Sequence, residues 1–235
     1  MPVQVADQLY GRLRAELGPG PVLDVGIGTG AVSAELVARG VPVLLLDVVD
    51  MRGPHAPAAP FVLGSACELP IGAESVTGVH LARVLHHVPD WRLALAEALR
   101  VLVPGGALCL TLGGRLYANQ LASLRDQVFD AGERLGLRGA HHVHEPRGVE
   151  AVDAELGIEP EVVEYRFDVT GTPRQAVTDA ANHTYAWQPG QDLTVLRPVA
   201  DQVLTESGLD PDAPITHERV VSYRIYRKPG ESRPQ

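Results

Sequence analysis

Hydrophobic and polar residues follow two different periods along the first part of the chain. Apolar residues recur at helical spacing over 6–17, and the glycines and prolines at 18–21 should end that helix. The run at 22–25 is short and apolar, which predicts a buried strand, and a helix is predicted over 31–39. The run VPVLLLD at 41–47 is almost continuously apolar, as in parallel strands that are covered on both faces.

The same alternation continues up to residue 112. Short strands are predicted over 61–64, 76–80 and 107–112, and a helix over 90–102, with Asp90 as its N-cap residue. Strands that alternate with helices in this way predict a parallel sheet with right-handed crossovers.

The pattern changes in the second half of the chain. A helix is predicted over 115–135, and two further helices over 172–182 and 192–206. The segments 161–169 and 220–227 alternate strictly between apolar and polar residues, which predicts strands with one buried face. We therefore expect this pair of strands to form an antiparallel edge on the sheet.

Composition and charge exclude several classes of partner. The 235 residues carry a net charge of −9, and Lys228 is the only lysine, so nucleic acid and anionic membrane surfaces are not expected to bind. No run of about 18 apolar residues is present, and residues 1–18 lack the apolar core of a signal peptide, so the cytoplasm is the expected location. Cys67 and Cys109 do not form a disulfide pattern.

The segment VLDVGIGTG places glycines directly behind the first predicted strand. Gly26, Gly28 and Ala31 fit the dinucleotide pattern G-x-G-x-x-G/A, and Asp47 follows at the distance expected for a ribose-binding carboxylate. The glycine turn alone therefore fits both NAD and S-adenosylmethionine. Asp24 favours the second ligand, because a carboxylate here would repel a pyrophosphate but tolerates an ammonium and a sulfonium group.

Five motifs in register carry a family resemblance. VLDVGIGTG, LLLDV, GSACELP, ARVLHHVPDW and LRVLVPGGALCLTLG occur in the order and spacing of the class I S-adenosylmethionine-dependent methyltransferases of the small-molecule, type 11-like group. The chain resembles this family closely over 20–112 and loosely at 219–227. The resemblance implies an α/β fold: a doubly wound, mostly parallel, seven-stranded Rossmann-like sheet, with an antiparallel strand at its C-terminal edge and a helical substrate lid. It also implies one domain, 1–235, that consists of an N-terminal helix (1–20), a cofactor-binding half (21–112), a substrate-side half with the lid (113–228) and a tail (229–235).

The resemblance also implies a cofactor site for S-adenosylmethionine. Asp47 should accept hydrogen bonds from the ribose hydroxyls, and Asp50 is its rival by register; the apolar run stops at Asp47, which favours that residue. Ser65 stands where the family often has an aspartate beside the adenine, which leaves that contact in doubt. The predicted cofactor-binding residues are Asp24, Gly26, Ile27, Gly28, Gly30, Asp47, Val48, Ser65, Ala66, Cys67 and Arg83.

Histidines supply the candidate catalytic groups. His86 should face the transfer site, where an imidazole could accept a proton from the acceptor, and His87 should pack against the domain; a purely structural role for both is the alternative. A second cluster contains His141, His142, His144 and Glu145. His142 is the second catalytic candidate, and a solvated loop is the alternative. We predict no metal site, because the cluster lacks a recognisable ligand spacing.

The sequence thus predicts methyl transfer from S-adenosylmethionine to a small organic acceptor, in a monomer or a homodimer. Three alternatives remain open. The same cofactor site could serve a non-methylating enzyme such as a cyclase. The glycine turn could belong to an NAD-dependent oxidoreductase, or the protein could bind the cofactor without any turnover.

Overall fold

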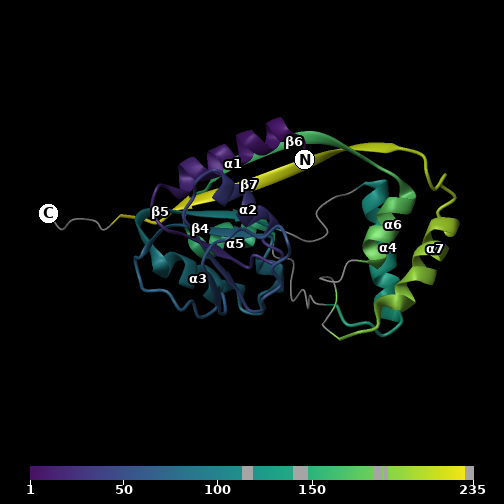
Figure 1. Ribbon diagram of the computed structural model, residues 1–235, viewed down its shortest axis with the longest axis horizontal. Coiled ribbons are helices and arrows are strands. Elements are labelled where there is room, and N and C mark those ends of the chain that lie inside the picture. Colours follow the sequence, from purple (N-terminus) through teal and green to yellow (C-terminus); the bar gives the residue numbers. More distant parts are fainter. Residues whose placement is uncertain (113–118, 140–147, 183–186, 188–189, 231–235) are drawn as a thin grey trace. The chain divides into compact units, whose positions relative to one another are not determined.

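The computed structural model describes residues 1–112, 119–139, 148–182, 187 and 190–230. Within these residues, seven strands form one sheet in the order β3-β2-β1-β4-β5-β7-β6 (Figure 1). The pairs β3–β2, β2–β1, β1–β4 and β4–β5 are parallel, and β7 is antiparallel to β5. The mostly parallel sheet with an antiparallel edge is therefore confirmed, with β6 lying outside β7. The strands are β1 (Val22–Val25), β2 (Val43–Asp47), β3 (Phe61–Leu63), β4 (Val76–Ala82), β5 (Leu102–Thr111), β6 (Glu161–Gly171) and β7 (Ile215–Arg227).

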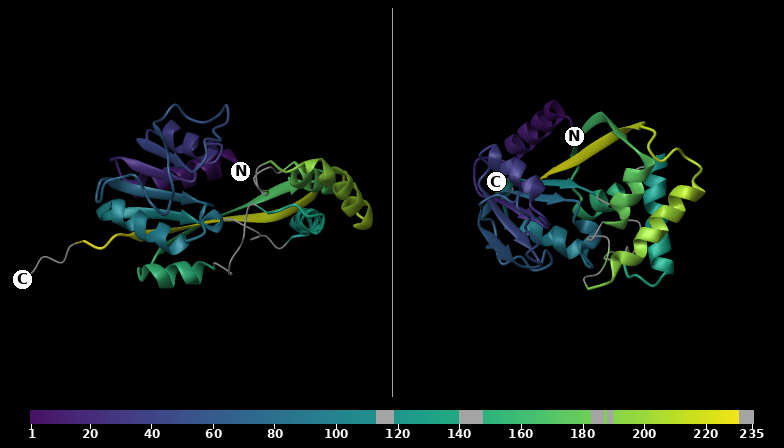
Figure 2. Two further views of the ribbon diagram at one scale, coloured as in Figure 1. Left: turned by 90° about the horizontal axis from the view of Figure 1, so that it is seen from below. Right: turned by 45° about the vertical axis from the view of Figure 1, so that its right-hand side comes forward.

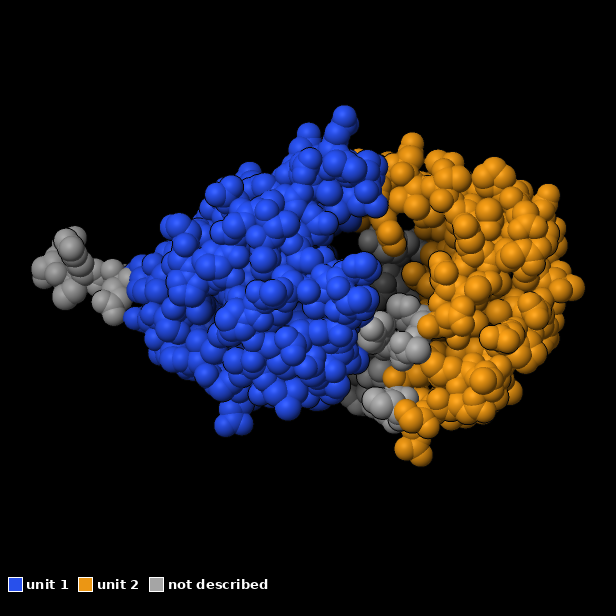
Figure 3. Space-filling view, viewed as in Figure 1, with its two compact units in different colours: residues 1–114, 144–165, 221–235 blue, residues 115–143, 166–220 orange. Residues whose placement is uncertain are grey.

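The chain folds into two compact units (Figure 3). Unit 1 comprises Met1–Gly114, His144–Tyr165 and Val221–Gln235, and unit 2 comprises Arg115–Val143 and Arg166–Val220. The unit boundaries differ from the predicted division at residue 113, because part of the expected substrate-side half belongs to unit 1.

Helices cover both faces of the sheet in unit 1 (Figure 2). On one face, α1 (Val3–Leu17) and α2 (Ala31–Ala38) pack against β1, β2, β5 and β7. On the other face, α3 (Trp91–Val101) and α5 (Val149–Leu156) pack against the same sheet. The predicted cap of α3 is confirmed, since the Asp90 carboxylate accepts a hydrogen bond from the Leu93 amide at 3.0 Å.

Two features of unit 1 differ from the sequence prediction. No helix was predicted over α5, although Val149, Val152 and Leu156 have helical spacing. The VPGG segment was expected to precede a strand at Ala107, whereas β5 already begins at Leu102. Leu102 pairs with Val76, and the register then shifts so that Ala107 pairs with Gly78, which makes VPGG a bulge inside the strand.

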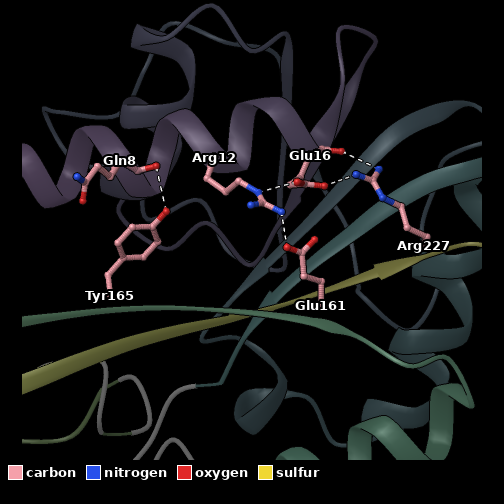
Figure 4. Close-up of polar contacts among 6 residues, drawn as sticks. All are labelled: Gln8, Arg12, Glu16, Glu161, Tyr165 and Arg227. Carbon is pink, nitrogen blue, oxygen red and sulfur yellow. Dashed lines mark hydrogen bonds and ion pairs between the residues drawn. The ribbon is translucent and has the colours of Figure 1, made fainter.

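A chain of polar contacts joins α1 to the last two strands within unit 1 (Figure 4). Each of these ion pairs has at least one side chain that is open to solvent, and such pairs each contribute no more than about 1 kcal/mol. The buried face of α1, which includes Leu9, Leu13 and Leu17, therefore supplies most of its attachment. The polar contacts are Arg12–Glu16 and Arg12–Glu161, both at 2.6 Å, the Glu16–Arg227 ion pair, and the Tyr165 hydroxyl donating to the Gln8 carbonyl at 3.2 Å.

Unit 2 is built from α4 (Gln120–Arg134), α6 (Pro173–Ala181) and α7 (Leu196–Glu206), and a 3-10 turn, η3 (Leu193–Val195), precedes α7. Side chains from all three helices form one apolar core around Trp187. The three predicted helices are confirmed, but α4 begins at Gln120, and residues 113–118 lie outside the described part. None of the helices in the described part of the chain has the length and apolarity needed to cross a membrane.

Candidate methyl-donor site

The glycine turn between β1 and α2 has one closed side and one open side. Gly26, Gly28 and Gly30 have φ angles of 73°, 53° and 80°, a region that disfavours other residues. A Cβ atom on Gly26 would lie 2.1 Å from Cγ2 of Val84, so the segment after β4 packs directly on the turn. A Cβ atom on Gly28 would meet nothing within 4 Å, which leaves that side of the turn open to a ligand.

Asp47 ends β2 and faces the glycine turn. Its carboxylate is buried, and it accepts hydrogen bonds from the Gly28 amide at 2.9 Å and from the Val49 amide at 3.3 Å. Each carboxylate oxygen has a further lone pair, so Asp47 retains the capacity to accept bonds from a ligand. The rival Asp50 is exposed and pairs with Arg52, whose hydrogen bonds lower the pKa of Asp50 to about 2. This placement favours Asp47 as the ligand-binding carboxylate.

Asp24 is the second buried carboxylate, and both of its oxygens have partners. One oxygen accepts from the Ser33 hydroxyl at 2.6 Å, and the other lies 2.8 Å from Nδ1 of His80. The His80 ring is fully buried, and its Nε2 lies 3.1 Å from the hydroxyl of Tyr223. Burial raises the pKa of Tyr223 well above its ordinary value, so this phenol keeps its proton. The result is a continuous polar chain from α2 across β1 and β4 to β7.

The remaining predicted cofactor residues follow β2, β3 and β4. Val48 is exposed directly after Asp47, and Ala66 is buried. The Ser65 hydroxyl accepts a hydrogen bond from the Cys67 amide at 3.1 Å, while the Cys67 thiol donates to the Asp90 carbonyl at 3.3 Å. These contacts shape a tight turn next to β3.

The proline-rich loop after Asp50 is confirmed as a loop, and it packs on the glycine turn. Its Gly53 amide donates to the Thr29 carbonyl at 3.1 Å. A Cβ atom on Gly30 would lie 2.9 Å from Cβ of Ala56. The loop therefore packs against Thr29 and Gly30 and holds this part of the turn in place.

The predicted catalytic segment continues from β4 into the short 3-10 turn η1 (Leu85–His87). Arg83 has a φ angle of 55°, and its amide donates to the Thr111 carbonyl at 2.8 Å. His86 is half-buried, whereas His87, which was expected to pack against the domain, is exposed; their ring centroids lie 4.0 Å apart. The turn therefore brings His86 to the strand ends at which Val84 touches the glycine turn.

His142, and with it His141, His144 and Glu145, lies outside the described residues.

The electrostatics of the site suit a cationic ligand without phosphate. Apart from tyrosines, tryptophans and Cys109, four residues with polar or charged side chains are buried within the described ranges: Asp24, Ser33, Asp47 and His80. Two of the four are carboxylates: Asp47 is the last residue of β2, and Asp24 is the last residue but one of the neighbouring parallel strand β1. The open side at Gly28 and these carboxylates together fit an adenosine with a ribose diol and a positive charge, whereas a pyrophosphate would be repelled.

Comparison with known proteins agrees with this geometry. Residues 23–110 match the model of a methyltransferase domain family. This match supports a class I S-adenosylmethionine-dependent methyltransferase domain over residues 23–110. The family resemblance seen in the sequence motifs is thereby confirmed. An uncharacterized methyltransferase of Mycobacterium tuberculosis is 39% identical over 98 residues, which are 40% of this chain and 40% of that protein. The matched part thus spans less than half the length of such curated relatives.

Solved structures of other proteins share the fold over nearly the whole length of this chain. The YcgJ protein from Bacillus subtilis superimposes with a TM-score of 0.61 at 14% identity, covering 97% of this chain and 99% of that one. The [4+2]-cyclase SpnF superimposes with a TM-score of 0.54 at 19% identity, covering 97% and 82%. Identities this low establish the fold and leave the reaction open.

Sequence reasoning missed the polar chain behind Asp24. His80 had a recognisable signal, since it is the one histidine inside the apolar β4 run VTGVHLA. Tyr223 and Ser33 had none, because each belongs to an element that periodicity alone explains. Val84 was missed for the same reason, although its side chain closes one side of the glycine turn.

Proposed function

We propose that this protein transfers a methyl group from S-adenosylmethionine to a small organic acceptor. The observation that carries the proposal is a pair of buried carboxylates at a glycine turn that is open at Gly28: Asp24 lies two residues before Gly26, and Asp47 accepts a hydrogen bond from the Gly28 amide. The net charge of −9 argues against a nucleic acid as the acceptor.

The residues of this site would share the work of holding the cofactor. Asp47 would accept hydrogen bonds from the ribose diol, since its spare lone pairs lie next to the open side of the turn. Asp24 would supply negative charge for the ammonium group, and Val48 and Ser65 would flank the adenine. The bound cofactor supplies an electrophilic methyl group, so the protein's main contribution is alignment, which is worth up to about 7–11 kcal/mol.

His86 is the proposed general base. It follows the end of β4, two residues after the side chain that contacts the glycine turn. A base there would accelerate transfer to a hydroxyl by about 10²–10⁴-fold and would add little for an unprotonated amine. His142 is a second proposed base. We assign acceptor recognition to residues 113–200, because none of them lies within the family match.

Calorimetry with S-adenosylmethionine, S-adenosylhomocysteine and NADH tests the cofactor assignment. We expect both sulfur compounds to bind and NADH not to bind. Asp47→Ala should weaken binding of both about a hundredfold, because it removes charged hydrogen bonds to the ribose. Binding of NADH alone would refute the assignment, and an unchanged Kd for Asp47→Ala would refute the role of that residue.

Substitution of the two neighbouring histidines tests the proposed base. His86→Ala should lower kcat while the Kd for S-adenosylhomocysteine stays constant. His87→Ala is the matched control, because His87 is exposed and its ring lies beside that of His86. Equal rates for His86→Ala and wild type would assign His86 to packing alone.

A cyclase is the second candidate, because the cyclase SpnF has the same fold. The two reactions differ in cofactor stoichiometry. Methyl transfer releases one S-adenosylhomocysteine for each product, whereas a cyclisation consumes no cofactor. Substrate conversion without release of S-adenosylhomocysteine would favour the cyclase.

A further inference from the structure

The buried polar chain behind the glycine turn has a direction that chemistry dictates. A carboxylate only accepts hydrogen bonds, so Nδ1 of His80 must donate to Asp24. In a neutral ring Nε2 then has a lone pair, which accepts from the Tyr223 hydroxyl. The Ser33 hydroxyl donates to the other oxygen of Asp24. Both carboxylate oxygens are thus fixed by donors, and the carboxylate cannot rotate without breaking one of these bonds.

The sheet register explains how these side chains meet. Asp24 and His80 are direct partners in the parallel pair β1–β4, so they point to the same face of the sheet. Tyr223 reaches this face from β7, where it belongs to the apolar core beneath α1. Its ring is stacked on that of His80, with centroids 5.7 Å apart and planes 16° apart.

The position of His80 is not explained by stability alone. A buried polar pair is often no more stable than apolar side chains of the same size, and such a replacement is frequently stabilising. Asp24, in contrast, lies two residues before Gly26, at the strand ends where we propose that the cofactor binds. A fixed carboxylate at this point is useful to a ligand whose positive charge must be held in one place.

We propose that His80 is a positioning residue for the amino group of the cofactor, and that it acts by fixing the Asp24 carboxylate, with Tyr223 supporting it from behind. The inference rests on the proposed function and names the part of the ligand that this side of the site recognises. His80 itself touches no ligand. Its loss should therefore affect binding of the amino group and leave binding of the adenosine part unchanged.

Two ligands that differ only in the amino group give the test. One is S-adenosylhomocysteine, and the other is its deamino analogue, in which hydrogen replaces the amino group. Calorimetry on the wild type should show tighter binding of the amino compound. His80→Leu should weaken S-adenosylhomocysteine binding by about 10- to 100-fold, the range of a charge-assisted contact. The deamino analogue should bind within about threefold of wild type.

Matched variants separate positioning from general damage to the fold. His80→Asn keeps an N–H donor at the position of Nδ1, so affinity for S-adenosylhomocysteine should stay within about threefold of wild type. Tyr223→Phe keeps the hydrogen bond from His80 to Asp24, so it should weaken S-adenosylhomocysteine binding less than His80→Leu does. Tyr226→Phe is the control: this buried tyrosine of β7 donates to Asp153 at 2.7 Å on the other face of the sheet, and its loss should leave both ligands unaffected.

A double-mutant cycle tests whether His80 acts through Asp24. Asp24→Asn removes the charge, so His80→Leu added to it should cause no further loss of affinity. The proposal would be overturned if His80→Leu weakened binding of both ligands equally or did not weaken binding at all. It would also be overturned if His80→Leu caused its full loss of affinity in the Asp24→Asn background. If His80→Leu does not fold, His80→Phe keeps an aromatic ring without nitrogen donors and is held to the same outcomes. Failure of the wild type to bind either ligand would instead refute the proposed function, and this inference with it.

Discussion

Gly26 provides a quantitative test of the glycine turn, through the substitution Gly26→Ala. Its φ angle of 73° disfavours a residue with a side chain by roughly 1–2 kcal/mol. The added Cβ atom would also lie 2.1 Å from Cγ2 and 2.7 Å from Cβ of Val84. Overpacking of this kind typically costs about 1–3 kcal/mol. We therefore expect Gly26→Ala to lower the free energy of unfolding by about 2–5 kcal/mol.

Gly28→Ala is the matched control for this prediction. Gly28 has a φ angle of 53° in the same turn, but a Cβ atom there would meet nothing within 4 Å. Gly28→Ala should therefore lower the free energy of unfolding only by the backbone cost of roughly 1–2 kcal/mol. Urea unfolding followed by circular dichroism, with the midpoints compared at a common slope, measures both losses without any ligand.

The contact with Val84 can be tested separately from the backbone. Val84→Ala removes both γ carbons and leaves the Cβ atom, so it should restore part of the stability that Gly26→Ala loses. The two substitutions should therefore be non-additive, as expected for atoms in direct contact. Equal losses for Gly26→Ala and Gly28→Ala, together with additive behaviour of Val84→Ala, would refute the packing of the η1 segment on the turn.

Three further predictions follow from the structure. Burial raises the pKa of the Cys109 thiol to about 12. A thiol reagent at pH 8 should therefore modify only the half-buried Cys67 in the native protein, and both cysteines after unfolding. Rapid modification of two thiols per native chain would contradict this. Burial opposes ionisation of Asp153, but the hydrogen bonds from Arg224 outweigh this effect and lower the pKa of Asp153. Its contribution to stability is therefore present above about pH 4 and is lost as the pH falls further. Below pH 4 the free energy of unfolding should fall less steeply with pH for Asp153→Asn than for the wild type. Asp90→Ala removes the cap of α3 and should lower the unfolding free energy by about 1 kcal/mol, and an unchanged urea midpoint would show that water replaces the cap.

Much of the fold could be predicted from the sequence because local patterns determine it. The apolar runs of β1 and β2 and the helical spacing of α1 each mark their own element. The helix α5 was missed because only eight residues form it and Val152 is its one fully buried residue. The early start of β5 was missed because a bulge depends on the partner strand, which periodicity does not reveal.

The candidate site could be predicted in part, and for the same physical reason. Asp47 follows an apolar run at the end of β2, and Asp24 stands within the short apolar run of β1, two residues before the glycine turn, so the positions of both can be derived from the sequence. Their partners cannot, because the contact between His80 and Tyr223 joins residues 143 positions apart. A lone histidine in an apolar strand indicates a buried polar contact, but only the sheet order places Tyr223 beside it.

The two carboxylates of the site are held in different ways, and the difference bears on what each could recognise. Asp47 is held by backbone amides of the turn and of its own strand end, so any residue sequence that keeps the backbone keeps that contact. Asp24 is held entirely by side chains, from Ser33 and His80. A ribose diol is common to all adenosine ligands, which suits a backbone-fixed acceptor. Recognition of the group that distinguishes one adenosine ligand from another is better served by side chains, because substitution can tune them individually. The orientation of Asp24 is therefore the feature of this site that we expect to determine which adenosine compound binds.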